Sequence, residues 1–537
     1  MDTLIVASLA TPLLVAGLLW FPLSRAFGLR LAPWAALPAL LLALIAPVPQ
    51  QFDLPWLLLG TRLGLDETGH VFLLFTALIW LAAGWFARAW LANDARRHVF
   101  AGFFLLTQAG NLGVCLALDA ASFYFFFALM SFAAYGLIVH DRSAAAWRAG
   151  KVYLMLALAG EMLILSGLLL AVGAHPLAVA CLILGFGVKT GLPLLHVSLP
   201  PAYAAIPIPG AAVLAGAMIK AGLLGWLRFL PLGEAALPDT GTAMLLAGLL
   251  AIFFGSVVGL TQRLPGALLA YSSISQMGVL AVAVGAGLLA PGLWPLLLPA
   301  VILYAVHHAL AKSALFLGLG VLQRHGATPG VLLGLALPAL ALAGAPLTSG
   351  MLAKSGLKQA LQTLPAPWAD TLPLLLALGA LGTALLMLRL LWLVQHQPAQ
   401  PDAASSGLMA PWLLTLLGVA GLAAWLAPVA AWQSALTTQA VLAASWPLFA
   451  ALALAYTAQR SELRAPAIPP GDLLQPLERL LATLWRQRSH LPRLATPPTL
   501  PRTAAHPPRL EAQLRVWSLA GGLWLAGVAI LVALLAR

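Results

Sequence analysis

The sequence predicts an all-α polytopic membrane protein with about 14–16 transmembrane helices. Composition is the first reason, because 62% of its 537 residues are hydrophobic and only 8% are charged, far more apolar than a soluble core requires. The second reason is that apolar stretches about 20 residues long, enough to cross a bilayer core, recur along the chain. Arginines gather in particular loops between these stretches, which is typical of cytoplasmic loops.

The apolar stretches follow one another with short polar connections. The first lacks the basic flank and cleavage site of a signal peptide, so we expect it to remain as a helix. Some stretches are long enough to hold two short or broken helices. The predicted spans lie near 4–20, 31–48, 71–91, 99–118, 121–140, 152–173, 177–195, 205–230, 241–260, 267–290, 293–322, 331–362, 371–395, 408–428, 431–457 and 516–536.

Basic loops orient the chain in a bacterial inner membrane. Arg96 and Arg97 mark one loop, Arg142 and Arg148 mark another, and residues 460–515 hold nine arginines against four acids. By the positive-inside rule these loops, and 460–515 above all, are predicted to be cytoplasmic. This topology and contact with anionic lipid head groups account for the net charge of +12 without nucleic acid as a partner.

Residues 460–515 are the clear departure from membrane-spanning sequence. Prolines break the preceding helix, and leucines from 473 to 484 then fall on one stripe at helical spacing, which predicts an amphipathic helix. A Pro-rich linker (493–508) and a last span (516–537) follow. The amphipathic helix is either an ordinary surface helix or a docking element.

Cysteine usage argues against a resident cofactor or metal site. The chain has two cysteines, Cys115 and Cys181, and both lie in predicted spans. They form neither a disulfide framework nor a metal-binding pattern. The sequence also lacks a cysteine cluster for iron–sulfur and a Gly-rich nucleotide loop. We therefore expect no redox chemistry from this chain itself.

Lysine placement is the most informative feature. The loops contain mostly arginine. Five of the six lysines lie inside or against predicted spans: Lys189, Lys220, Lys312, Lys354 and Lys358. Arginine stays charged at essentially any pH, while a desolvated lysine can exchange a proton near neutrality. Lys358 is expected to reach an interface with its long side chain. The others predict a path for protons, or for cations in their place.

The run GFGVKTGLPLLHVSLP (185–200) is the first of four motifs that carry these lysines. Lys189 stands four residues before Pro193 and is flanked by glycines, and His196 follows. So much glycine and proline predicts a discontinuous helix. Free backbone groups beside a lysine would then make a polar, hydrated spot inside the membrane.

Three later motifs place further titratable groups on separate helices. AGAMIKAGLLGWLRF contains Lys220, and PLTSGMLAKSGLKQAL contains Lys354. In YAVHHALAKSALFLGLG, His308 and Lys312 are four residues apart and share a helix face. Hydroxyl and amide groups that could hold water between these sites come from AYSSISQMG, at Ser272, Ser273 and Gln276.

Acidic residues inside the membrane are rare in this chain and therefore functional candidates. Glu161 lies well inside a predicted span, and Asp119 sits in the tight junction between two spans. For Asp119 a helix N-cap is the favoured role. Glu161 is a candidate buried partner for a lysine, or it lies near a helix end and faces a watery crevice.

These motifs resemble one family. The run KTGLPLLHVSLPPAYAAIPIPGAAVLAGAMIKAG is similar to the signature of the antiporter-like membrane subunits shared by respiratory complex I, membrane-bound hydrogenases of the formate hydrogenlyase type and multi-subunit cation/proton antiporters. LLAYSSISQMG, HHALAKSALFLGLG and PLTSGMLAKSGL match the family in the same order. Together they cover roughly residues 100–395.

The resemblance implies two inverted five-helix repeats, each with a broken helix, at 99–230 and 241–395. N-terminal helices (1–98) and C-terminal helices (396–459) would flank them. By position, Lys189 resembles the broken-helix lysine of the first repeat and Lys354 its counterpart in the second. Lys220 resembles the eighth-helix lysine, and His308 with Lys312 the central pair. In the family these groups form a water-linked axis.

Two positions depart from the family pattern. The family usually carries a glutamate in the fifth helix that pairs with the first broken-helix lysine, and here SFYFFFALM has Ala128. RLPGALLAYSS has Leu264 and Gly266 where the family tends to have Asp-x-Lys. Either Glu161 replaces the missing carboxylate, or this half-channel is inactive and the chain serves a coupling or structural role.

Our leading hypothesis is a proton-translocating subunit of a larger complex, with other membrane subunits and a redox or large peripheral subunit as partners. It would belong to a translocase like NADH:quinone oxidoreductase or hydrogenase. Three further hypotheses stay open: a cation/proton antiporter subunit, the membrane subunit of an inorganic carbon uptake complex with a large zinc protein, and a non-pumping scaffold.

Overall fold

The computed structural model describes residues 1–58, 60–172, 175, 177–395 and 407–461, with positions 466, 468–471, 473, 474, 476 and 483. Most of the predicted segment 460–515, and all of the predicted span 516–537, lie outside the described residues. The described membrane helices belong to one compact unit, made of Met1–Phe52 and Arg62–Leu473, and the segment Asp53–Thr61 belongs to a second.

The N-terminal part consists of helices and a short hairpin that precede the first motif. Its elements are α1 (Asp2–Trp20), α2 (Arg25–Leu31), a 3₁₀ turn (Ala32–Trp34), α3 (Leu37–Ile45), β1 (Gln50–Leu54), β2 (Thr61–Leu65) and α4 (Glu67–Trp90). The pairing of β1 with β2 is an addition to the predicted all-α architecture.

A first series of helices holds the motifs around Lys189 and Lys220. It comprises α5 (Arg97–Leu116), α6 (Ala120–Ile138), α7 (Ala144–Val172), α8 (Leu177–Thr190), a 3₁₀ turn (His196–Ser198), α9 (Leu199–Ala205), α10 (Ile208–Val213), a π-helical segment (Leu214–Met218) and α11 (Ile219–Phe229). The π-helical segment joins α10 and α11 into one span.

A second series holds the motifs around Lys312 and Lys354. It comprises α12 (Pro238–Leu260), α13 (Pro265–Leu289), a 3₁₀ turn (Pro291–Leu293), α14 (Trp294–His325), α15 (Pro329–Ala343), α16 (Ser349–Leu361) and α17 (Trp368–Gln395). Three further helices follow it: α18 (Met409–Leu426), α19 (Val429–Ala435) and α20 (Thr438–Arg460).

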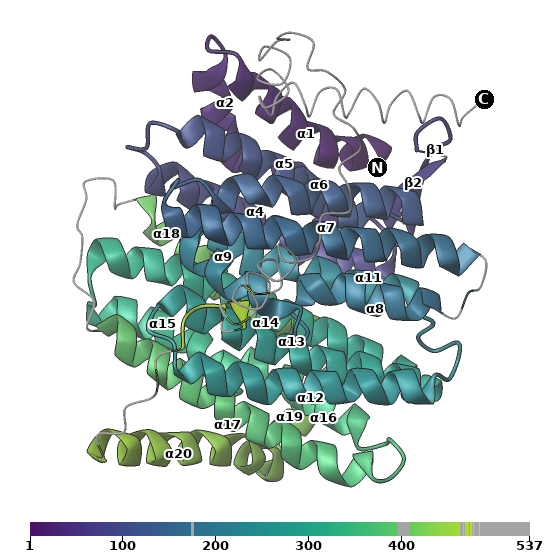
Figure 1. Cartoon of the computed structure of the whole chain (residues 1–537), viewed down its shortest axis with the longest axis vertical. Helices are drawn as coiled ribbons and strands as arrows, with labels where there is room; N and C mark the ends of the chain where they lie inside the picture. The colour runs from purple at the N-terminus through teal and green to yellow at the C-terminus, as the bar shows by residue number, and fades with distance from the viewer. Residues whose placement is uncertain are drawn as a thin grey trace, which may run out of the picture. The chain divides into compact units, whose positions relative to one another are not determined.

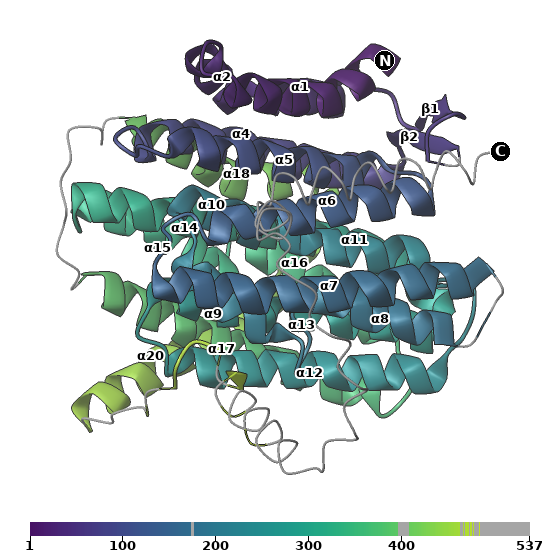
Figure 2. The ribbon, with the colours of Figure 1, turned by 45° about the horizontal axis from the view of Figure 1, so that its top comes forward.

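Length and composition confirm a multi-pass membrane protein. Thirteen helical segments among the described residues are long and apolar enough to cross a membrane, and α8 and α15 are shorter apolar helices. Within the compact unit the long helices run side by side, with α1 and α2 at one end and α20 at the other (Figure 1). Turning the view keeps α13 and α14 inside the stack of helices (Figure 2). These two helices are almost wholly buried over most of their length.

Each series contains a broken helix, and both breaks have the same four-residue pattern, Gly-x-Pro-Leu. The first runs from Gly191 to Leu194 and the second from Gly344 to Leu347. Backbone φ is positive at both glycines (+80° and +85°) and at both leucines (71° and 63°). Glycine accepts such angles without strain, and proline cannot continue a helix. The second break divides the predicted stretch 331–362 into α15 and α16.

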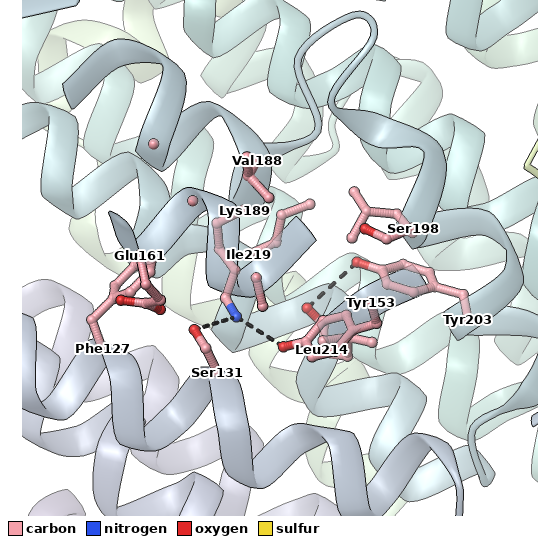
Figure 3. Close-up of a pocket in the computed structure, with 14 residues that line it drawn as sticks. Phe127, Ser131, Tyr153, Glu161, Val188, Lys189, Ser198, Tyr203, Leu214 and Ile219 are labelled. Carbon is pink, nitrogen blue, oxygen red and sulfur yellow. Dashed lines mark hydrogen bonds between the residues drawn. The ribbon is translucent and has the colours of Figure 1, made fainter. Parts of the chain in front are cut away.

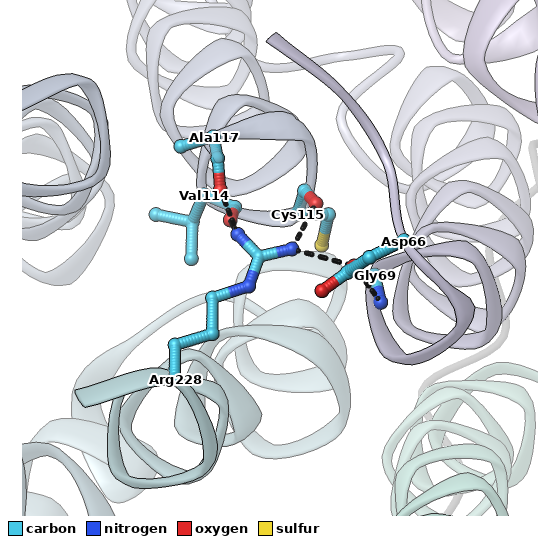
Figure 4. A network of polar contacts seen from close by, with 6 residues as sticks. All are labelled: Asp66, Gly69, Val114, Cys115, Ala117 and Arg228. Carbon is cyan, nitrogen blue, oxygen red and sulfur yellow. Dashed lines mark hydrogen bonds and ion pairs between the residues drawn. The ribbon is translucent and has the colours of Figure 1, made fainter. Parts of the chain in front are cut away.

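Arg228 ties the end of α11 to α4 and α5 (Figure 4). Its guanidinium donates to the carbonyl oxygens of Val114, Cys115 and Ala117, which are released where α5 ends. It also forms an ion pair of 3.0 Å with Asp66, the N-cap of α4. The planar guanidinium suits this arrangement because it donates in several directions at once.

We expect Arg228→Lys to destabilise the protein. A lysine keeps the charge but cannot reach all these acceptors, and each buried carbonyl left without a donor costs about 1–3 kcal/mol. The expected result is a lower thermal unfolding temperature of the purified protein in detergent. Arg88, exposed near the end of α4, is the control, and Arg88→Lys should leave the temperature unchanged. Equal temperatures for both variants would contradict this role of Arg228.

Candidate functional site

Lys189 occupies a buried polar cavity just before the first helix break (Figure 3). Its Nζ donates to the hydroxyls of Ser131 on α6 and Tyr153 on α7, at 3.1 Å each. The rings of Phe127 and Tyr153 lie 5.6 and 5.5 Å from the same nitrogen, within range of a cation–π contact. The cavity measures about 20 Å³, which is room for about one water molecule.

Glu161 on α7 lines the cavity of Lys189. Its carboxylate and the lysine nitrogen both point toward the Ser131 hydroxyl (Figure 3). Glu161 is buried, with 1% of its surface exposed, and it is close enough to Lys189 for the two groups to interact electrostatically. Ala128, where the family usually has glutamate, lies on α6 near this cavity but is not part of its lining. A carboxylate therefore approaches Lys189 from α7 instead of α6.

Lys220 is hydrogen-bonded to a backbone carbonyl of the π-helical segment. Its Nζ donates to the carbonyl oxygen of Ala215 at 3.0 Å. A π-helical turn changes the backbone pairing of an α-helix and is frequent at functional sites. Leu214 and Ile219, at and beside this segment, also line the cavity of Lys189. The surroundings of the first two lysines therefore adjoin each other.

Lys312 lies in the centre of the bundle on α14 and is fully buried. Its Nζ donates at 2.9 Å to the carbonyl oxygen of Leu269 on α13. Ser273 donates to the same carbonyl at 3.1 Å. Lys220 and Lys312 are close enough to act on each other electrostatically. Lys312 therefore continues the series of amines from the first half of the chain into the second.

Two adjacent histidines on α14 complete the centre. His308, predicted as part of the axis, is fully buried, and neither of its ring nitrogens has a hydrogen-bond partner among the described residues. It lies within electrostatic reach of Lys220, Lys312 and Lys354. His307, which no sequence motif singled out, is also fully buried. Its Nδ1 lies 2.9 Å from the Ser349 hydroxyl on α16.

Lys354 lies on α16, beyond the second break, and is partly buried. Its Nζ donates at 2.7 Å to the carbonyl oxygen of Leu342, one of the last residues of α15. The last carbonyls of a helix have no partner within that helix, so the break supplies this acceptor. The side chain also lies against Gly344, the glycine of the break. The break therefore positions Lys354 as well as interrupting the helix.

A larger cavity of about 310 Å³ opens beside Lys354. Lys358, Gln276 and Thr383 line it together with residues from α19 and α20. Gln276 donates to Thr383 at 2.8 Å and accepts from Tyr304 at 2.7 Å. This polar network borders the cavity, so Lys354 has an open space with polar groups on one side.

A second large cavity, of about 560 Å³, lies beside the arginine-rich loops. Asp94 and Asp141 line it, and so does Tyr203, which also lines the small cavity of Lys189. Burial acts to raise the pKa of Asp94, but hydrogen bonds from His140 and from the Arg96 backbone hold that pKa below its usual value. Partial desolvation raises the pKa of Asp141, which remains exposed. Tyr203 thus lies between this large cavity and the small cavity that holds Lys189.

The remaining predicted residues have varied surroundings. Asp119 is the N-cap of α6, as predicted, and accepts from Ser122 N at 2.8 Å. His196 lies in the first break and packs on the rings of Phe254 and Tyr271. Ser272 is buried, and its hydroxyl has no hydrogen-bond partner among the described residues. Asp119 therefore serves the fold, while His196 packs within the first break.

Sequence comparison identifies the region that contains this site. Residues 174–369 match the family model described as NADH:quinone oxidoreductase/Mrp antiporter, TM. This part of the chain belongs to that family. The match covers all four lysines of the proposed axis and both central histidines. The resemblance inferred from the four motifs is thereby confirmed.

Curated relatives of the NADH:quinone oxidoreductase/Mrp antiporter family come from several kinds of complex. A Staphylococcus haemolyticus protein named putative antiporter subunit mnhA2 is 26% identical over 382 residues, which are 60% of this chain and 48% of the relative. NADH-quinone oxidoreductase subunit N of Desulforudis audaxviator is 29% identical, over 49% of this chain and 56% of the relative. The chain thus spans about half the length of these relatives.

Two solved structures share the fold of this chain. The Mrp complex from Dietzia sp. matches with a TM-score of 0.69 and 22% identity, over 98% of this chain and 60% of the matched chain. The membrane-bound sulfane sulfur reductase, an archaeal respiratory membrane complex, matches with a TM-score of 0.65 and 20% identity, over 83% and 97%. Both matches show that this chain has the fold of chains found in these two membrane complexes.

Proposed function

We propose that this chain translocates protons as a membrane subunit of a larger energy-converting complex. The protons move along a buried axis formed by Lys189, Lys220, the pair His308 and Lys312, and Lys354. Glu161 is the counter-charge of Lys189. Other membrane subunits accompany the chain, and a redox or large peripheral subunit supplies the driving energy.

The observation that carries this proposal is the continuity of the buried amines. Lys220 and Lys312 are fully buried, and 8% of the Lys189 surface is exposed. Each of the four axis lysines donates to a neutral hydroxyl or backbone carbonyl. A neutral acceptor serves a lysine in either protonation state, and at Lys189 the nearby Glu161 carboxylate favours the protonated amine. Such partners leave an amine able to gain and lose a proton.

Cavities at the two ends of the axis support a route with separate openings. The cavity of about 560 Å³ shares Tyr203 with the Lys189 cavity, and the cavity of about 310 Å³ borders Lys354. The first lies beside loops predicted to be cytoplasmic by their arginines. We infer that the Lys189 end exchanges protons with that side and the Lys354 end with the other.

Cation/proton antiport is the second candidate. The relatives include proteins named as antiporter subunits, among them a probable K(+)/H(+) antiporter subunit of Rhizobium meliloti, at 29% identity over 57% of this chain. In that case the same axis would exchange protons against Na⁺ or K⁺, with no redox partner. Inorganic carbon uptake and a purely structural role are not favoured by any contact or cavity of the described residues.

Replacing Lys220 by arginine tests proton exchange separately from charge. Arginine keeps the positive charge but does not release its proton, so we expect proton movement to fall at least about tenfold. The complex is purified through this chain, reconstituted in vesicles, and driven first by its electron donor and then by an imposed Na⁺ or K⁺ gradient. A pH-sensitive dye reports the rate under each condition.

The matched control is Lys151→Arg, because Lys151 is an exposed residue of α7 outside the axis. It should behave like the unmodified complex. Proton movement that survives Lys220→Arg unchanged would contradict a lysine-based axis. A response to the cation gradient alone would select antiport over redox-driven pumping.

A further inference from the structure

His307 lies where α14 meets the first turn of α16. Its Nδ1 is 2.9 Å from the hydroxyl of Ser349, and its Cε1 is 3.0 Å from the position that a Cβ on Gly350 would take. Gly350 and Lys354 are four residues apart on α16 and therefore share a helix face. The imidazole thus packs one turn away from Lys354, on the same face.

His308 faces the other part of the axis from the next position on α14. It is four residues before Lys312, so these two side chains share one face of α14. Adjacent residues on a helix point about 100° apart, which directs His307 elsewhere, toward α16. His307 lies within electrostatic reach of both Lys354 and Lys220. The two histidines therefore join the central lysines to the second broken helix.

The hydrogen bonding of His307 is incomplete in a way that suits proton transfer. A neutral imidazole has one nitrogen that donates and one that accepts. Nδ1 is engaged by Ser349, while Nε2 is buried and has no hydrogen-bond partner in the described part of the chain. In either tautomer, Nε2 is then an open donor or acceptor inside an apolar bundle, which is costly unless it serves a purpose. A packing role alone would be filled better by an apolar side chain.

Resting on the proposed function, we propose that His307 is a proton-transferring residue that connects the His308 and Lys312 centre to Lys354 through Ser349. Nε2 accepts a proton from the His308 side, and the Nδ1–H bond breaks as its proton passes to the Ser349 oxygen. The serine hydroxyl releases its original proton toward Lys354. One proton enters and one leaves, and a water molecule that takes the Nε2 proton and returns one to Nδ1 restores the first tautomer.

Two substitutions of His307 separate transfer from packing. His307→Asn places an amide where Nδ1 stands and can keep the bond to Ser349, while His307→Gln places an amide where Nε2 stands. Neither amide relays protons. We expect both variants to assemble with unchanged thermal stability and to move protons at least about tenfold more slowly. The rate should also become more sensitive to replacement of H₂O by D₂O, because transfer between the two halves would then limit turnover.

Ser349 offers an independent test on the other side of the bond. Ser349→Ala removes the acceptor of His307 and is expected to slow proton movement severalfold. Ser355 is the matched control, because it is a partly buried serine of the same helix whose hydroxyl donates to its own helix, at Leu352. Ser355→Ala should leave the rate unchanged.

A Lys354→Ala complex measured in parallel separates the two hypotheses. If Lys354→Ala abolishes proton movement and His307→Asn is normal in rate and isotope sensitivity, His307 is not a transfer residue. If Lys354→Ala is also without effect, the proposed function itself fails. Loss of rate in both His307 variants with intact stability supports the inference.

Discussion

Lys354→Ala is expected to reduce coupled proton movement at least about 100-fold, the scale on which a positioned proton donor or acceptor contributes. Lys354 is the last amine of the axis, and the carbonyl of Leu342 holds it at the second helix break. It also borders the cavity of about 310 Å³ through which protons would exchange. Without the Lys354 amine, protons from the central histidines and lysines have no titratable group through which to reach that cavity.

The control for Lys354→Ala is Lys358→Ala. Lys358 lies one turn later on α16 and lines the same cavity, so its removal changes the charge and packing there to a similar extent. We expect Lys358→Ala to keep most of the activity, because its long side chain is predicted to reach toward the interface. Equal losses in both variants would assign the effect to the cavity and not to the Lys354 amine. The measurement is the vesicle assay, with subunit composition checked by gel filtration.

Glu161→Gln is expected to have the second largest effect, a loss of proton movement of about tenfold to 100-fold. Glutamine is similar in shape but cannot carry the charge that faces Lys189 in their shared cavity. A lysine without a counter-charge at membrane depth favours its neutral form, and the first half of the axis would then hold protons poorly. Normal transport by Glu161→Gln would show that the first half works without this carboxylate, or does not work at all.

If Glu161→Gln lowers the rate, a compensating variant tests whether the carboxylate must come from α7. Ala128 stands where the family usually has glutamate, on α6 beside Phe127 of the same cavity. Adding Ala128→Glu to Glu161→Gln returns a carboxylate from the other helix and is expected to restore part of the rate. If the double variant stays inactive while the complex remains assembled, the carboxylate must approach from α7 to function.

The positions of the lysines and of the first break follow directly from the sequence. Buried charge is costly in a membrane, so Lys189, Lys220 and Lys312 were recognisable as candidates without a structure. Glycine and proline around Lys189 have few other roles in an apolar helix. That Glu161 lines the same cavity as Lys189 does not follow from the sequence, since spacing does not tell which helices lie side by side.

Other features of the site were not predictable, for identifiable reasons. The π-helical segment at Leu214–Met218 has no distinctive residue pattern, because π-turns arise from how neighbouring helices pack. His307 has the same residue type as its neighbour, and its contact with Ser349 depends on how α14 packs against α16. The hairpin of β1 and β2 lies between apolar spans, where short strands give a weak periodic signal. Each of these depends on tertiary contacts between distant segments.

The two Gly-x-Pro-Leu breaks share a backbone turn but differ in where the nearby lysine stands. Both turns bend the chain with the same residues and similar backbone angles, yet Lys189 stands two residues before the glycine of its turn and Lys354 ten residues after the glycine of its own. The Gly-x-Pro-Leu break therefore does not fix where the titratable lysine stands relative to it. A substitution can therefore move a lysine, or change its polar neighbours, in one half of such a protein without altering the backbone break beside it.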